Sequence, residues 1–263
     1  MRVRFCVLLG LLLSAHALAA EPLRLCYEDV PQGYWTRPDG SGVALDLVRK
    51  VESRLGEHFT YTSLPWKRCL EEVRIGTMDA VVGAADSPER HAYGVYPTQA
   101  DGSLDSRTAI WTDFFNVFYR ADSKVKWDGK DLNVPSGTVV AQRSYVVAEI
   151  LRSRGYKVVD STKSVVDGLR FLVEGTAEAA VLQGVEAEWL CANDPRFRGL
   201  IRQGSAHYVV LPLYFLSARP SYQRDPKRIQ AIWNEIRAVR ESADFRKLEE
   251  ATARSYHGNA EGH

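Results

Sequence analysis

The sequence has almost no excess charge of either sign. Its 34 Lys and Arg residues are matched by 33 Asp and Glu residues, which leaves a formal net charge of +1. Proteins that hold nucleic acid non-specifically carry a strong positive field, so this class is disfavoured. Four cysteines among 263 residues are also too few for a disulfide-rich scaffold. The composition is that of an ordinary folded protein, with enough length for one or two cores.

Long apolar runs and metal-binding patterns are missing as well. After residue 20, no stretch is long and apolar enough to span a bilayer, which takes ~20 residues. The chain has no CxxC or HExxH motif and no paired Cys and His spacing, so we expect neither a metal nor a cofactor. A GxSxG motif, which would indicate a nucleophilic serine, is also missing.

The first twenty residues are typical of a secretory signal peptide. Arg2 and Arg4 precede a short apolar segment at 5–13, and small residues around Ala19 suit a signal peptidase. We expect cleavage after Ala19 or Ala20. Because no Cys follows the small residues, we expect no lipid anchor. These features predict a periplasmic protein that is not inserted stably in the membrane.

Cleavage at this position also changes the cysteine count. It removes Cys6 and leaves Cys26, Cys69 and Cys191. In an oxidising compartment, three thiols allow one disulfide and one spare cysteine. The sequence leaves open which two of them pair.

Strand and helix patterns alternate twice along the mature chain. Alternating or wholly apolar segments predict strands, and apolar residues at helical spacing predict helices. The predicted strands are 22–26, 59–63, 80–82, 116–119, 138–142, 157–160, 179–182 and 208–217. The predicted helices are 42–55, 66–75, 144–154, 164–174, 185–191, 225–240 and 242–256. This order predicts two similar α/β units with parallel strands and a cleft for a small ligand between them.

Four groups of short segments occur in a distinctive order. They are 42–48 (GVALDLV); 65–68 (PWKR) with 76–83 (GTMDAVVG); 87–90 (SPER) with 96–97 (YP); and Leu169 and Leu172 with 175–181 (GTAEAAV). The ordered set resembles the family 3 extracytoplasmic solute-binding proteins, which serve polar amino acid ABC transporters. The resemblance covers nearly the whole mature chain.

The resemblance implies an α/β type II periplasmic binding fold, in which each of two lobes is an α/β sandwich. Two crossover strands near 116–120 and 208–217 would join the lobes, and the last helices would return to the first lobe. The expected division is a signal peptide at 1–20, lobe 1 at 21–117 plus 214–263, and lobe 2 at 118–213.

The implied function is periplasmic binding of a small polar or carboxylate-bearing, amino-acid-like solute. The protein would be a monomer that catalyses no reaction and delivers its small-molecule ligand to an ABC transporter permease.

The resemblance also implies ligand contacts in lobe 1. Arg90 matches the arginine that clamps the carboxylate of the ligand, a task that suits a planar, permanently charged guanidinium. Ala85 lies where the family often has Ser or Thr, so only its backbone N–H would donate. Trp66 matches a residue that packs on the ligand. The first loop supplies four further candidates, for which simple packing is the alternative: Tyr27, Glu28, Tyr34 and Trp35.

In lobe 2 the candidates lie where a strand passes into a helix. Arg143, Ser144 and Tyr145 occupy this position, and free N–H groups at the helix start would bind the carboxylate of the ligand. Ser144 is also predicted to be the N-cap of the helix. Arg143 replaces a small residue of the family and would fill part of the pocket or add positive charge.

Gln183 is the most informative departure from the family pattern. It stands where the family has an Asp that pairs with the α-ammonium of the ligand, and an amide carries no charge. The difference predicts a ligand that is not an ordinary α-amino acid, or one that is bound differently. Glu186 and Glu188 are predicted to be exposed helix residues rather than substitutes for the missing acid.

Two other functions remain open. A sensory or accessory protein would bind a ligand without feeding a transporter, and a neighbouring permease gene would decide between the two. A dehydratase-like enzyme on the same fold would need an acid or base in the cleft, for which Glu28 is the candidate. A turnover assay would identify such an enzyme.

Overall fold

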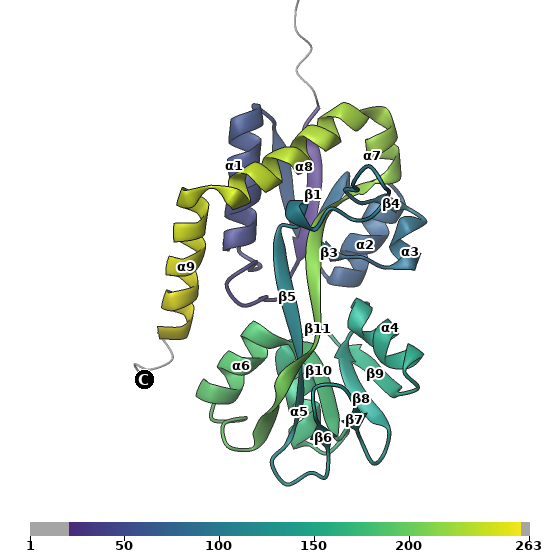
Figure 1. Ribbon diagram of the computed structural model, residues 1–263, viewed down its shortest axis with the longest axis vertical. Coiled ribbons are helices and arrows are strands. Elements are labelled where there is room, and N and C mark those ends of the chain that lie inside the picture. Colours follow the sequence, from purple (N-terminus) through teal and green to yellow (C-terminus); the bar gives the residue numbers. More distant parts are fainter. Residues whose placement is uncertain (1–20, 259–263) are drawn as a thin grey trace, which may run out of the picture.

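The computed structural model describes residues 21–258, and the predicted signal peptide at residues 1–20 lies outside them. Two lobes follow one another along the longest axis, and two long strands run through both (Figure 1). We call the lobe that contains the first described strand lobe 1 and the other lobe 2. Within the described range, no helix has the length and apolar character that crossing a membrane requires.

Lobe 1 is built on a short parallel sheet covered by helices. Its elements are β1 (Leu23–Glu28), α1 (Val43–Leu55), β2 (Phe59–Leu64), α2 (Trp66–Arg74), β3 (Ala80–Ala85), α3 (Pro88–His91) and β4 (Gly94–Val95). β1 lies between β2 and β3 and pairs in parallel with both. Helix α1 ends at Gly56, whose φ of 64° gives the left-handed turn that stops a helix. Every residue of β3 is buried, so this strand forms the centre of the lobe.

Lobe 2 repeats this plan. Its elements are β6 (Lys126–Trp127), β7 (Leu132–Asn133), β8 (Thr138–Gln142), α4 (Val146–Ser153), β9 (Lys157–Thr162), α5 (Val165–Val173), β10 (Ala179–Gln183) and α6 (Gly184–Asn193). β8 lies between β9 and β10 and pairs in parallel with both. Ser164 and Asp167 form a capping box that fixes the start of α5. The parallel α/β units predicted from the sequence are therefore present.

Two antiparallel strands, β5 (Trp111–Arg120) and β11 (Ile201–Ala218), connect the lobes. They join all the larger strands into one sheet with the order β2-β1-β3-β11-β5-β10-β8-β9. The short helix η1 (Ser106–Thr108) precedes β5. Both strands begin earlier than predicted. The first half of β11 mixes buried and exposed residues irregularly, and its register with β5 shifts between Gln203 and His207, which weakens the apolar pattern of this strand.

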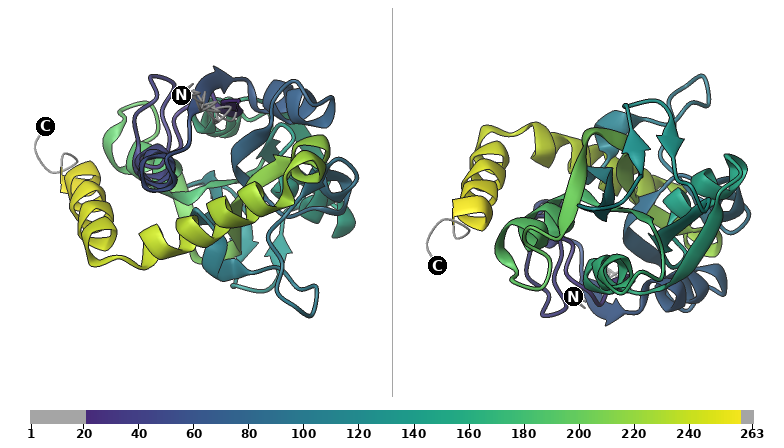
Figure 2. Two further views of the ribbon diagram at one scale, coloured as in Figure 1. Left: turned by 90° about the horizontal axis from the view of Figure 1, so that it is seen from above. Right: turned by 90° about the horizontal axis from the view of Figure 1, so that it is seen from below.

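The chain ends in three helices, α7 (Arg219–Arg224), α8 (Pro226–Glu241) and α9 (Ala243–Gly258). α8 lies across lobe 1 and packs on α1, as the view from above shows (Figure 2). α9 packs on α1 and α8 in lobe 1, and its last turns also reach α6 in lobe 2. The extended backbone of Ser242 (ψ 142°) ends α8, so α9 starts in a new direction.

The disulfide links two elements of lobe 1. Cys26 on β1 pairs with Cys69 on α2, with their Cα atoms 5.7 Å apart. Cys191, on α6, is the spare thiol. The bond therefore holds the helix that begins with Trp66 against the strand that ends with Glu28.

Candidate functional site

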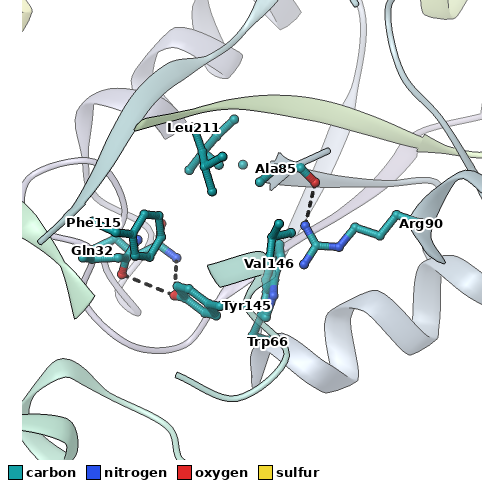
Figure 3. A pocket seen from close by; sticks show the side chains of 11 residues that line it. Gln32, Trp66, Ala85, Arg90, Phe115, Tyr145, Val146 and Leu211 are labelled. Atoms are coloured by element: carbon teal, nitrogen blue, oxygen red, sulfur yellow. Dashed lines mark hydrogen bonds between the residues drawn. The ribbon is translucent and has the colours of Figure 1, made fainter. Parts of the chain in front are cut away.

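A small cavity, with about 20 Å³ open to the centre of a water-sized molecule, lies between the lobes (Figure 3). Both lobes and both connecting strands contribute to its wall. The lining residues are Gln32, Trp66, Gly83, Ala85, Arg90, Phe115, Tyr145, Val146, Gln183, Leu211 and Leu213. Most of the wall is apolar, and the few polar side chains are of the kind that orient a small ligand.

Arg90 is a buried cation at one side of this cavity. It lies on α3, whose first turn is capped by Ser87, and only 3% of its surface is exposed. Its Nη1 donates to the carbonyl of Ala85 at 2.7 Å, and its Nη2 donates to the carbonyl of Ser144 at 3.0 Å. Within the described chain, Arg90 has no carboxylate at ion-pair distance. A buried charge whose partners are all neutral is suited to receive an anion.

The carbonyl of Ser144 connects the two lobes at this point. Besides Arg90, the Nε1 of Trp66 donates to it at 3.2 Å. Ser144 has a φ of 63°, a left-handed conformation that is uncommon for a residue other than glycine. The prediction that Ser144 caps the helix is wrong, because Tyr145 occupies the N-cap position. The left-handed turn places Ser144 one residue before the cap, with its carbonyl at the lobe 1 side chains.

The other side of the cavity holds a chain of buried polar side chains. The hydroxyl of Tyr145 donates to Glu28 across the lobes, and the Nε2 of Gln32 donates to the same carboxylate at 2.5 Å. The Oε1 of Gln183 lies 3.3 Å from the hydroxyl of Tyr145. The Nε2 of Gln183 donates to the Oδ2 of Asp113 at 2.6 Å. Asp113 thereby orients the amide so that its oxygen faces the cavity side.

The two carboxyl groups in this chain are fully buried and bond to neutral donors. Burial raises the pKa of Glu28 to about 7, against the opposing hydrogen bonds from Tyr145 and Gln32. Burial likewise raises the pKa of Asp113 to about 6. Neither group has a cation at ion-pair distance among the described side chains. Both groups therefore change protonation near neutral pH and favour a donor or a cation close by.

Asp113 thus supplies the carboxylate that position 183 lacks, on the far side of the Gln183 amide from the cavity. Asp113 on β5 contacts Gln183 directly, which the sequence does not indicate because the two positions are 70 residues apart. The prediction that Glu186 and Glu188 are exposed is wrong. Glu186 is partly buried and accepts from Tyr256 at 2.7 Å. Glu188 is also partly buried and accepts from Asn116 at 2.7 Å.

The structure brings together only part of the predicted set. Trp66, Ala85, Arg90, Tyr145 and Gln183 line the cavity, and Glu28 and Ser144 bond to residues that line it.

The other candidates in the first loop and the second lobe lie elsewhere. Tyr27 is buried, and its hydroxyl donates to the carbonyl of Pro38. Trp35 stacks on Trp111 with ring centroids 5.7 Å apart. Tyr34 packs against Trp35 and Tyr256, and the Nη2 of Arg143 donates to the carbonyl of Ser161. These four residues make packing or surface contacts and do not line the cavity.

Sequence reasoning missed several residues of the cavity. Gln32 lies in the first loop, where Glu28 and the aromatic residues were predicted as ligand contacts instead. Phe115, Leu211 and Leu213 belong to the connecting strands, where an apolar residue that faces a cleft resembles one that faces a core. Val146 was predicted only as part of a helix.

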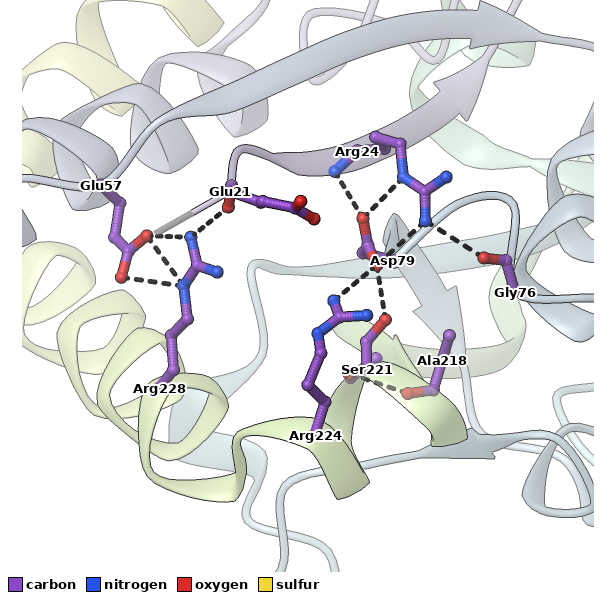
Figure 4. A network of polar contacts seen from close by, with 10 residues as sticks. Glu21, Arg24, Glu57, Gly76, Asp79, Ala218, Ser221, Arg224 and Arg228 are labelled. Atoms are coloured by element: carbon purple, nitrogen blue, oxygen red, sulfur yellow. Dashed lines mark hydrogen bonds and ion pairs between the residues drawn. The ribbon is translucent and has the colours of Figure 1, made fainter. Parts of the chain in front are cut away.

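A second group of buried polar contacts lies outside the cavity and holds lobe 1 together (Figure 4). Asp79 accepts from the Nε of Arg24 at 2.9 Å, from Ser221 at 2.6 Å and from Arg224 at 3.0 Å. The group joins β1, the start of β3 and α7. The buried carboxylate of Asp79 has donors on both oxygens, and the two guanidiniums reach solvent, which indicates a structural role. No three His, Cys, Asp or Glu side chains within residues 21–258 are arranged to hold a metal ion.

No protein-family model matches the chain, and no curated protein matches it in sequence. Solved structures do match. A histidine kinase sensor domain with similarity to periplasmic binding proteins has 16% identity and a TM-score of 0.68, covering 89% of this chain and 96% of its own. The protein has the type II periplasmic binding fold. The predicted two-lobed α/β architecture is therefore confirmed.

Two further structures with this fold are ligand-binding proteins by their descriptions. The ligand-binding core of GluR0 from Nostoc punctiforme, in complex with L-glutamate, has 14% identity and a TM-score of 0.64, covering 90% of this chain and 98% of its own. AncCDT-1, an ancestral amino-acid-binding protein and precursor of cyclohexadienyl dehydratase, has 18% identity and a TM-score of 0.64, covering 88% and 94%. At such identities the likeness concerns the fold.

Proposed function

We propose that this protein binds a small carboxylate-bearing solute in the cavity between its lobes and catalyses no reaction. The observation that carries the proposal is Arg90, a buried guanidinium whose hydrogen-bond partners are two backbone carbonyls. A carboxylate forms shorter and stronger hydrogen bonds with a guanidinium than a neutral carbonyl does. The solute carboxylate would replace the carbonyl of Ser144, and the ring of Trp66, 5.4 Å from the guanidinium, would pack beside it.

The opposite side of the cavity supports a hydrogen-bond donor on the same solute. The Oε1 of Gln32 is buried and has no hydrogen-bond partner in the described part of the chain. The Oε1 of Gln183 lies on the same side, and Glu28 and Asp113 stand behind these amides. An ammonium or amide group suits this set of acceptors. The preferred solute is therefore amino-acid-like, with an apolar part between its polar groups.

The setting that we propose is the periplasm, reached through the signal peptide at residues 1–20. There the protein would act as a monomer, close its lobes around the solute by a hinge motion and deliver it to an ABC transporter permease. For the lobe boundaries we retain 117/118 and 213/214, which place the hinge within β5 and β11. A sensing role is the second candidate, favoured by the structural likeness to a histidine kinase sensor domain.

An enzymatic role ranks lower. Glu28 has a raised pKa and lies next to the cavity, which are properties of a general acid or base. However, both hydrogen bonds to its carboxylate come from the protein's own Gln32 and Tyr145. A turnover assay with solutes that bind would test this role directly, and unchanged solute after incubation is the expected result.

The test is thermal unfolding of the chain from residue 21 against amino acids, matched carboxylic acids and matched amines. A solute at ~100 times its dissociation constant stabilises the folded state by about 2.7 kcal/mol. Arg90→Ala should abolish this stabilisation. Arg170→Ala is the matched control, because Arg170 is exposed on α5, pairs with Glu174 and does not line the cavity. A preference for amines without a carboxylate, or binding that survives in Arg90→Ala, would contradict the proposal.

A further inference from the structure

Helix α9 starts on lobe 1 and ends on lobe 2. Near its start, Phe245 is fully buried in the same core as α1 and α8. In its last turns, Tyr256 contacts residues of α6. Figure 1 shows the yellow α9 passing along the side of the molecule, from the level of α8 toward α6. The helix therefore forms a connection between the lobes that is separate from β5 and β11.

Tyr256 meets two segments that belong to different lobes. Its hydroxyl donates to the Oε2 of Glu186 on α6 at 2.7 Å, and its ring lies 6.2 Å from the ring of Trp189 on the same helix. Its ring also lies 5.8 Å from the ring of Tyr34, in the first loop of lobe 1. Aromatic pairs at such distances add stability beyond the area that they bury.

Glu186 is the acceptor that joins these segments. Besides Tyr256, the backbone N–H of Gly33 favours the charged form of this carboxyl and so opposes the rise in its pKa that burial causes. The first loop also packs tightly on the start of α6, because a Cβ on Gly33 would lie 2.5 Å from the Cγ1 of Val185. Separation of the lobes at this edge must therefore break the contacts of Glu186 with the first loop, with α9 or with both.

The same two segments reach into the cavity. Gln183 immediately precedes α6, as its N-cap residue, and Gln32 is the neighbour of Gly33 in the first loop. A change in the spacing of these two amides moves α6 relative to the first loop. Such a movement changes the contacts of Tyr256 with α6 and with the first loop.

We propose that α9 is a strap that holds the two lobes together through Tyr256 and Glu186, so that the position of α9 and the closure of the cleft are coupled. The coupling is reciprocal, as linkage requires: release of α9 favours lobe separation, and lobe separation releases α9. The strap stands independently of the solute assigned to the cleft, and its test uses no solute. Failure of the solute assay with Arg90→Ala therefore leaves this proposal unaffected.

The experiment compares the chain from residue 21 with three variants. Tyr256→Phe removes the hydroxyl alone, and Tyr256→Ala removes the ring as well. Arg254→Ala is the matched control on α9, because Arg254 is exposed and, among the described residues, pairs along the helix with Glu250. Hydrogen exchange by mass spectrometry reports on α9, on α6 and on residues 29–36, and small-angle X-ray scattering reports the radius of gyration.

For Tyr256→Ala, exchange should rise about tenfold in α9, in α6 and in residues 29–36 together, with a larger radius of gyration. Tyr256→Phe should shift exchange in the same direction by a smaller factor, and Arg254→Ala should match the wild type. Faster exchange confined to α9, with α6, the first loop and the radius unchanged, would overturn the proposal. If Tyr256→Ala does not fold, Tyr256→Phe and Glu186→Gln provide the same comparison.

Discussion

Removal of the disulfide should destabilise the protein strongly. Cys26 and Cys69 are both fully buried, and the bond closes a loop with a sequence separation of 43 residues. The entropy of closing a loop of that length in the unfolded chain corresponds to ~4 kcal/mol at 25 °C. The double variant Cys26→Ala/Cys69→Ala should lose about this much free energy of unfolding. For a chain of this size, that corresponds to a fall in Tm of roughly 8–16 °C.

Urea unfolding followed by circular dichroism, together with a thermal scan, measures the loss. Cys191→Ser is the matched control, because it removes a thiol that forms no disulfide within residues 21–258, and it should change the stability by about 1 kcal/mol or less. The bond also fixes α2 against β1, so the variant should loosen the contact of Trp66 with Ser144. Stability of the double variant within about 1 kcal/mol of the wild type would refute the loop-closure reasoning.

Three further predictions concern side chains of the site and of lobe 1. Burial raises the pKa of Glu28 to about 7 in the folded state, so the contribution of Glu28 to stability should be full below pH ~4 and fall by about 3 kcal/mol as the pH rises through 7. In Glu28→Gln, unfolding at several pH values should lack this slope. Burial acts to raise the pKa of Asp79, but hydrogen bonds from Arg24, Ser221 and Arg224 hold it well below its usual range. The contribution of Asp79 to stability is therefore present above pH ~4 and is lost as the pH falls. Asp79→Asn should lower the free energy of unfolding by about 3 kcal/mol at pH 7, as measured by urea unfolding. Ser144→Gly should keep or slightly raise Tm, whereas Ser144→Val should lower it, because a β-branched residue is strained at positive φ.

Each of these predictions has an outcome that contradicts it. For Glu28, the same pH slope in wild type and Glu28→Gln would show that another group titrates. For Asp79, a change below about 0.5 kcal/mol would show that its bonds contribute nothing net. For Ser144, equal Tm values in the Gly and Val variants would show that the left-handed turn is not required.

Local patterns predicted the two α/β units, whereas the type II fold was predicted from the family resemblance. The βαβ order follows from apolar periodicity. Such periodicity can be detected in a single sequence because it repeats over many residues. The connecting strands were predicted too short because half of β11 is solvated and irregular in register. The contact of α9 with lobe 2 was not predicted, since the hydrogen bond from Tyr256 to Glu186 depends on tertiary structure rather than on helical pattern.

The candidate site was predicted less completely, for a related reason. Arg90 and Trp66 stand in two of the ordered motifs that together carry the family resemblance. Asp113 could not be found in this way, because its role depends on Gln183, which lies on a strand that antiparallel pairing brings alongside β5. The pairing of Cys26 with Cys69 likewise depends on how α2 packs against β1, which no spacing rule fixes.

The carbonyl of Ser144 competes with a solute for the hydrogen bonds of Arg90. Because this carbonyl already satisfies Arg90 and Trp66, a solute gains only the difference between its own bonds and those it displaces. A neutral alcohol or amide replaces one neutral acceptor by another and gains little binding free energy. An anion adds its full charge interaction with the guanidinium of Arg90. With the function proposed above, the protein would therefore bind solutes that carry a negative charge and select against solutes that offer only neutral acceptors.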